Sequence, residues 1–107
     1  MRLDIKPLSV NKAWRGRRFK TDDYKNYEYQ CLMMLRPFQV PKGKLKLSLT
    51  LGFSSKASDI DNPVKCFQDI LCKKYGFDDK RIYHIAVQKV DVKKGQEFIE
   101  WQLKAVI

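Results

Sequence analysis

The sequence predicts a single α+β domain, residues 1–107, in which two helices pack on a mixed sheet. Three observations support this fold class. Segments with a period of two alternate with segments of helical period, in the order β-α-β-α-β-β. The chain is long enough for one hydrophobic core, and it contains no linker, internal repeat or low-complexity segment. Its 44% of hydrophobic and 32% of charged residues are typical of globular proteins.

The N-terminal third predicts an edge strand, a basic loop and a helix. Apolar residues alternate with polar ones over residues 3–10, and Pro7 confines such a strand to a sheet edge. Residues 11–20 have no clean period and predict a loop. Thr21 is a suitable N-cap for a helix whose apolar face recurs every three or four residues, and Pro37 ends it.

The middle of the chain predicts a strand followed by a second helix. Leucines alternate with polar residues over residues 45–51, as in a strand with one buried face. Asn62 is a natural N-cap, Pro63 suits the first helical position, and Gly76 closes this helix.

Two further strands complete the predicted sheet. Residues 82–90 are apolar on both alternating faces, which favours a central strand. A turn at residues 93–96 joins them to a last strand over residues 98–106, so these two strands are expected to form a hairpin.

Composition narrows the class of protein. The net charge of +10 and the pI near 9.7 favour a polyanionic partner, although such charge also serves solubility. No apolar run approaches the roughly eighteen residues of a membrane span, and the N-terminus lacks an apolar signal core. We therefore expect a cytoplasmic protein without a membrane partner. Three cysteines and the lone His84, with no Cys-x-x-Cys pair, indicate reduced thiols and no zinc site.

Acidic residues cluster within this basic chain. In an extended segment the side chains of Asp59 and Asp61 point the same way, about 6.6 Å apart, so both carboxylates can reach hard cations such as Mg²⁺. Asp79 can add a ligand if the chain doubles back after the helix. The alternative is structural: a turn and helix cap at Asp-x-Asp-Asn-Pro and a solvated loop at Asp78-Asp79.

Lys65 favours the metal interpretation. A cation in the first helical turn opposes the helix dipole, and the Lys65-before-Asp69 order offsets this only weakly. A locally unfavourable residue beside carboxylates is typical of a functional site, where a lysine can neutralise charge on a phosphate or orient the attacking water. A surface lysine paired with Asp69 is the alternative.

The predicted loop at residues 11–20 is rich in cations. Arginine side chains suit phosphate contacts, whereas Trp14 and Phe19 are expected either to stack on bases or to anchor the loop in the core. The cationic residues that we expect to contact DNA are Lys12, Arg15, Arg17, Arg18 and Lys20.

Over nearly its whole length the chain resembles the RusA family of Holliday junction resolvases. These are small, homodimeric, magnesium-dependent endonucleases of phage and prophage origin that cut four-way DNA junctions. An early Asn11 followed by an aromatic residue and a basic loop fits the family pattern. The most specific part of the resemblance is Asp59-x-Asp61-Asn62-x-x-Lys65, then Phe67-x-Asp69-x-Leu71, Gly76 and Asp78-Asp79.

The resemblance implies that Asp59, Asp61 and Asp79 bind the metal and that Lys65 is the catalytic lysine. It also implies that Asn11 belongs to the DNA-binding loop. The segment from Gly76 to the acidic pair is shorter than is usual in the family, so Asp78 is an alternative to Asp79. The proline-rich lead-in of the family is reduced to the proline at position 7.

We therefore expect an endodeoxyribonuclease that resolves Holliday junctions in DNA recombination and repair. It would use Mg²⁺ and no organic cofactor. Cutting two opposed strands of a junction requires two sites, which a two-fold homodimer supplies. Two alternatives are a non-catalytic basic nucleic-acid-binding module and a nuclease of the same fold that acts on flaps or forks.

Overall fold

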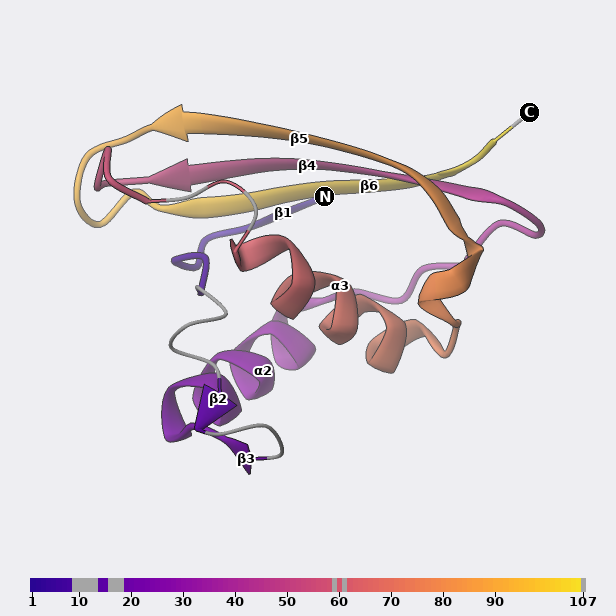
Figure 1. Cartoon of the computed structure of the whole chain (residues 1–107), viewed down its shortest axis with the longest axis horizontal. Helices are drawn as coiled ribbons and strands as arrows, with labels where there is room; N and C mark the ends of the chain where they lie inside the picture. Colours follow the sequence, from indigo (N-terminus) through magenta and orange to yellow (C-terminus); the bar gives the residue numbers. More distant parts are fainter. Residues whose placement is uncertain (9–13, 16–18, 59, 61, 107) are drawn as a thin grey trace.

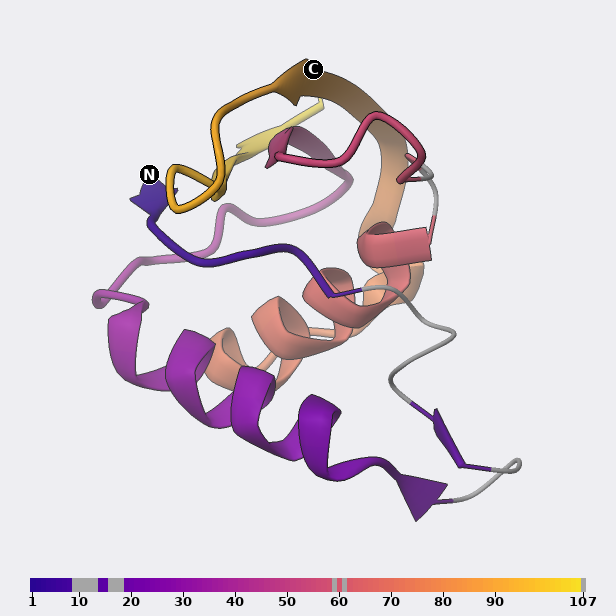
Figure 2. The ribbon, with the colours of Figure 1, turned by 90° about the vertical axis from the view of Figure 1, so that its left-hand side faces the viewer.

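The computed structural model describes residues 1–8, 14–15, 19–58, 60 and 62–106. Within them, a four-stranded mixed sheet and two helices make up the main body of the fold. The chain forms one small α+β domain, and both helices lie on the same face of the sheet (Figures 1 and 2). None of the helices within these residues is long and apolar enough to cross a membrane.

The sheet has the order β1-β6-β4-β5. Strands β1 and β4 each run antiparallel to β6, whereas β5 runs parallel to β4 on its other side. The strands are β1 (Arg2–Leu3), β4 (Leu45–Phe53), β5 (Ile82–Asp91) and β6 (Phe98–Ala105). The edge position predicted for the first strand is confirmed, although the strand is only two residues long.

Two predictions about the C-terminal strands are wrong. Strand β5 lies at the edge of the sheet and not at its centre, and β5 and β6 do not form a hairpin because β4 lies between them. The central place belongs to β4, whose alternating leucines are buried on the helix-covered face. None of the apolar residues of β5 is fully buried: Tyr83, Ile85 and Ala86 are exposed, whereas Ile82, Val87 and Val90 are partly buried. Apolar residues on both faces of this strand therefore do not indicate a central position.

The first helix, α2 (Asp22–Met34), begins as predicted. The Thr21 hydroxyl accepts a hydrogen bond from the Tyr24 amide at 3.1 Å, and Leu35 ends the helix. The buried side chains of α2 are Tyr24, Tyr27 and Cys31, at the predicted spacing of three and four residues, whereas Met34 at the end of the helix is exposed.

The second helix, α3 (Asn62–Tyr75), starts one residue earlier than expected, so Asn62 lies within the helix and is not its cap. Gly76 ends it as predicted, with a φ of 67° and an amide that donates to the Cys72 carbonyl at 2.9 Å. A left-handed φ is strained for residues with a Cβ, which is why glycine serves there.

The segment predicted as a basic loop contains a short pair of strands. Strands β2 (Trp14–Arg15) and β3 (Phe19–Lys20) pair antiparallel. They lie at the N-terminal end of α2, away from the main sheet (Figures 1 and 2).

One hydrophobic core joins the helices to the sheet. It includes Phe67, Ile70 and Leu71 of α3 together with the leucines of β4. Ion pairing also joins the two helices, because the Lys73 ammonium lies 3.1 Å from a carboxylate oxygen of Glu28. The core therefore fixes α3 over β4, which sets the position of the candidate site.

Gly52 in β4 provides a test of this packing. A Cβ at this position would overlap the ring of Phe98, its neighbour on β6. We expect Gly52→Ala to lower the free energy of unfolding by about 1–3 kcal/mol, measured by urea denaturation. The cost should shrink in a Phe98→Leu background, and equal costs in both backgrounds would contradict the overlap.

Candidate functional site

The candidate site lies where the chain returns to α3 after that helix has ended. The Lys65 ammonium lies 3.1 Å from Asp69 Oδ1 and 3.6 Å from Asp79 Oδ2. The Gln68 side-chain amide donates to the same Asp79 oxygen at 3.3 Å. Asp79 opens the short 3₁₀ helix η1 (Asp79–Arg81), so three residues after Gly76 the chain lies beside α3 again.

Local sequence explains this arrangement. Lys65, Gln68 and Asp69 are three and four residues apart, so their side chains share one face of α3. Gly76 allows the chain to reverse, and the partly buried Phe77 packs against the core. The reversal places Asp79 against that face of the helix.

Asp78 and Asp79 have different local roles. Asp78 is the N-cap of η1, and its carboxylate accepts a hydrogen bond from the Lys80 amide at 2.9 Å. That hydrogen bond lowers the pKa of Asp78. Asp79 instead turns toward α3. Of the two carboxylates considered from the sequence, Asp79 is the one that lies beside Lys65.

Lys65 is held as a cation. The hydrogen bond to Asp69 is the largest cause that raises the pKa of its ammonium, and the charge of Asp79 adds to the effect. The lysine side chain is 58% exposed, so solvent screens these attractions. One ammonium faces two carboxylates, which leaves the group with an excess of negative charge suited to a further cation.

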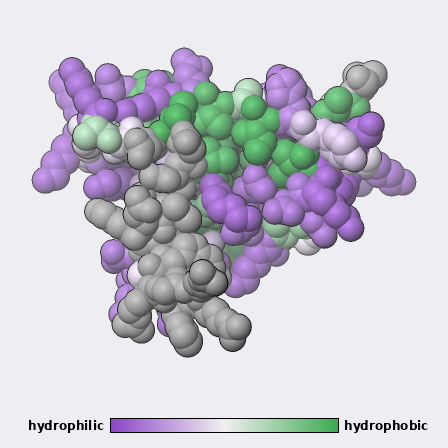
Figure 3. Space-filling model, in the orientation of Figure 1, coloured by the Kyte–Doolittle hydropathy of each residue, from purple (hydrophilic) through white to green (hydrophobic). Residues whose placement is uncertain are grey.

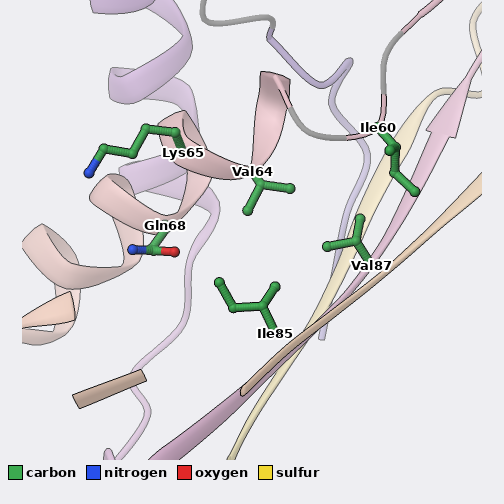
Figure 4. Close-up of a pocket in the computed structure, with 6 residues that line it drawn as sticks. All are labelled: Ile60, Val64, Lys65, Gln68, Ile85 and Val87. Carbon is green, nitrogen blue, oxygen red and sulfur yellow. The ribbon is translucent and has the colours of Figure 1, made fainter. Parts of the chain in front are cut away.

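Figure 4 shows how this face of α3 continues toward the sheet. Val64 faces Ile85 and Val87 of β5 across a cavity of about 500 Å³. Ile60, the residue between the two aspartates of the acidic motif, lines the same cavity, as do Lys65 and Gln68. The Lys89 ammonium donates to the carbonyls of Lys56 and Ser58 at 2.8 and 2.7 Å, so β5 holds the lead-in to this motif.

The structure therefore brings together part of the predicted site. Lys65 and Asp79 meet, whereas Asp59 and Asp61 lie outside the described residues. Among the residues that can be described, no three His, Cys, Asp or Glu side chains form a group that could hold a metal ion. The carboxylates of Asp69 and Asp79 are nevertheless the hard oxygen donors that Mg²⁺ prefers.

Most of the predicted DNA-binding loop is also outside the described residues. This applies to Asn11, Lys12, Arg17 and Arg18, and to the side chains of Arg15 and Lys20, whose backbones lie in β2 and β3.

Sequence reasoning missed Gln68, and it gave Asp69 no role beyond a partner for Lys65 and a place in the motif of the resemblance. The signal that identifies both residues is their spacing of three and four from Lys65 on a helix. Gln68 matters because its amide holds the Asp79 carboxylate in place.

A second basic surface lies beside Asp79. Lys80 and Arg81 follow it in η1, and together with Lys44 and Tyr83 they line a cavity of about 390 Å³. The Arg81 guanidinium donates to the carbonyls of Gly43 and Pro41, which fixes that wall of the cavity. These side chains are placed where a phosphate backbone near Asp79 would meet positive charge.

The cysteines do not contribute chemistry to the site. Cys31 and Cys66 are buried, Cys72 is partly buried, and none is in a disulfide. Burial raises the pKa of Cys31 to about 12 and those of Cys66 and Cys72 to about 11, so these thiols stay protonated near neutral pH.

A scan against protein-family models finds no match for this chain, and a search of curated proteins finds none either.

The pKa of Lys65 tests the geometry directly. We expect Asp69→Asn to lower this pKa more than Asp79→Asn, because the hydrogen bond to Asp69 is the larger cause of its elevation. NMR titration of ¹³C-methylated lysines would measure it. Asp78→Asn is the matched control, because Asp78 is not among the causes that raise this pKa, and it should shift the Lys65 pKa less than either change. An equal shift in that variant would refute the arrangement.

Proposed function

We propose that this protein is a magnesium-dependent endodeoxyribonuclease of the RusA type that resolves Holliday junctions. The observation that carries the proposal is the return of Asp79 to the face of α3 that presents Lys65, at 3.6 Å, in a chain of net charge +10. A carboxylate cluster within a basic protein suits a metal ion held against a polyanion.

Asp59, Asp61 and Asp79 would hold Mg²⁺, with Asp69 as a further oxygen donor close to Lys65. When bound, the metal supplies a water of lowered pKa and stabilises charge on the phosphate. Gln68 positions Asp79 by its hydrogen bond to the carboxylate.

Lys65 has the second role in this mechanism. Its raised pKa keeps the ammonium protonated at neutral pH, and its side chain is more than half exposed. A scissile phosphate that approaches the carboxylates therefore meets a fixed positive charge, which stabilises the charge that develops during hydrolysis.

The basic surfaces would position the junction. Lys44, Lys80 and Arg81 lie beside Asp79, and the cationic residues of the segment 11–20 would extend the contact. Lys73 and Lys74 are less suited to this task, because they bind Glu28 and the Leu32 carbonyl of α2.

The proposed substrate also bears on assembly and location. A four-way junction is resolved by paired cuts in opposed strands, so we propose a homodimer with two equivalent sites. DNA recombination and repair places such an enzyme in the cytoplasm.

A labelled four-way junction tests this function. We expect symmetric nicking in the presence of Mg²⁺ and none in its absence. Asp61→Asn and Asp79→Asn should reduce the cleavage rate by on the order of a hundredfold or more while junction binding is kept or strengthened, because each change removes a negative charge near phosphates. Asp78→Asn mainly alters the cap of η1, although Asp78 also contacts Asp79, so this variant should retain more activity than Asp79→Asn.

Other outcomes would overturn parts of the proposal. Cleavage by Asp61→Asn at the wild-type rate would show that the metal-site assignment is wrong. Junction binding with no Mg²⁺-dependent cleavage of any branched substrate would identify a non-catalytic nucleic-acid-binding module. Preferred cleavage of flaps or forks over junctions would keep the nuclease and change its substrate.

A further inference from the structure

Strand β5 presents an unusual edge. Within the described sheet it pairs with β4 on one side only, which leaves backbone amide and carbonyl groups along its other side without a strand partner. Natural edge strands are usually protected by charged residues, proline, bulges or short length. Although the pairing with β4 shifts register between Ile82 and His84, the run from Ile82 to Val87 contains no charged residue, no proline and no glycine.

The apolar side chains of β5 are also incompletely covered by the rest of the protein. Ile85 and Val87 stand beside Leu47 and Leu49 of β4 on the helix-covered face, where the leucines are buried. Ile85 is nevertheless 42% exposed. Figure 3 shows an apolar area over β5 and between β5 and α3, with hydrophilic surface beside it. The cavity lined by Val64, Ile85 and Val87 lies there (Figure 4).

We propose that β5 strands of two copies of this chain pair antiparallel about a two-fold axis, which joins two four-stranded sheets into one. The proposal gives a surface to the homodimer of the proposed function, and to that extent it rests on that function. A second copy fits this edge because an antiparallel pair of identical strands is self-complementary.

Charge supports this occupant and selects the register. A two-fold axis normal to the sheet keeps the helix-covered faces of both copies on the same side. In such a pairing one residue of β5 lies at the axis, directly opposite the same residue of the other copy. With Ile85 on the axis, Lys89 of one copy lies near the end of η1 that carries Arg81 of the other, and these like charges repel.

With Ala86 on the axis, the end of β5 that carries Asp91 instead lies near the end of η1 that carries Arg81 of the other copy. These opposite charges attract, although the Arg81 guanidinium itself is bound to the Gly43 and Pro41 carbonyls. The same register places Ile85 of one copy opposite Val87 of the other, an apolar pair on the helix-covered face. Each copy has a net charge of +10, but the strand along which the two copies meet is nearly neutral. The charges near its two ends are of opposite sign.

The pairing has a consequence for the candidate site. The cavity beside α3, which Lys65 and Gln68 also line, gains apolar side chains from the other copy. The two Lys65–Asp79 groups then lie on the same face of one joined sheet, related by the axis, as paired cleavage of opposed strands requires.

Sedimentation equilibrium without DNA or Mg²⁺ tests the surface. We expect a wild-type dimer and a monomeric Ile85→Lys variant, since that change buries an unpaired charge opposite Val87 of the other copy, on each side of the axis. Met33→Lys is the matched control, because Met33 is 70% exposed on α2, and it should remain dimeric. A monomeric wild type, or an Ile85→Lys variant that stays dimeric, would overturn the proposal.

Cross-linking tests the register and does not depend on the stability of Ile85→Lys. In the Cys72→Ser background, mild oxidation should link Ala86→Cys protomers, because directly opposed Cα atoms lie about 4.5–5.5 Å apart, within disulfide range. His84→Cys is the control, since residue 84 would lie opposite residue 88. Equal linking of both variants, or of neither, would refute this pairing.

These measurements distinguish the inference from the nuclease proposal. A protein that dimerises through β5 but cleaves no branched DNA would keep this surface and reject the proposed function. A protein that cleaves junctions while its Ile85→Lys variant stays dimeric would support the proposed function and reject the β5 surface.

Discussion

Burial of the leucine face of β4 is the constraint on which the rest of the structure depends. Leu45, Leu47 and Leu51 have no exposed surface, and they lie under helices that cover one side of the sheet. Because α3 must pack on this face, it crosses from the end of β4 to the start of a parallel neighbour. That crossover brings η1 back alongside α3 and so brings Asp79 to Lys65.

Local elements of this fold were predictable because their signals are local. The leucine alternation, the Thr21 cap and the Gly76 stop each act within a few residues. Strand order was not predictable in the same way. A strand with apolar residues on both faces suits a central position, and nothing local to β5 distinguishes that case from an exposed apolar edge.

In the candidate site, too, the local contact was predictable and the non-local contact was not. The contact between Lys65 and Asp69 follows from their spacing on one helix. The contact between Lys65 and Asp79 needs the chain to reverse at Gly76, which the sequence permits but does not require. Choosing Asp79 over Asp78 needed the cap geometry of η1, because adjacent identical residues carry no signal that separates them.

The basic residues show why net charge alone says little about where a polyanion binds. Some cations neutralise internal partners, as Lys73 does with Glu28. Others, such as Arg81, donate to backbone carbonyls and shape the surface. Lys44 and Lys80 line an open cavity, so position and not number decides which charges a ligand can meet.

The hydrogen bonds of Lys89 carry one more consequence. This residue stands on the edge strand, yet its ammonium binds the carbonyls of Lys56 and Ser58, just ahead of the acidic motif. Lys89 therefore connects β5 to the loop that contains Lys56 and Ser58, so a shift of one would move the other. Under the proposed function, such coupling would link the loop ahead of the acidic motif to whatever contacts the sheet edge, and it would discourage isolated cuts by an unassembled chain.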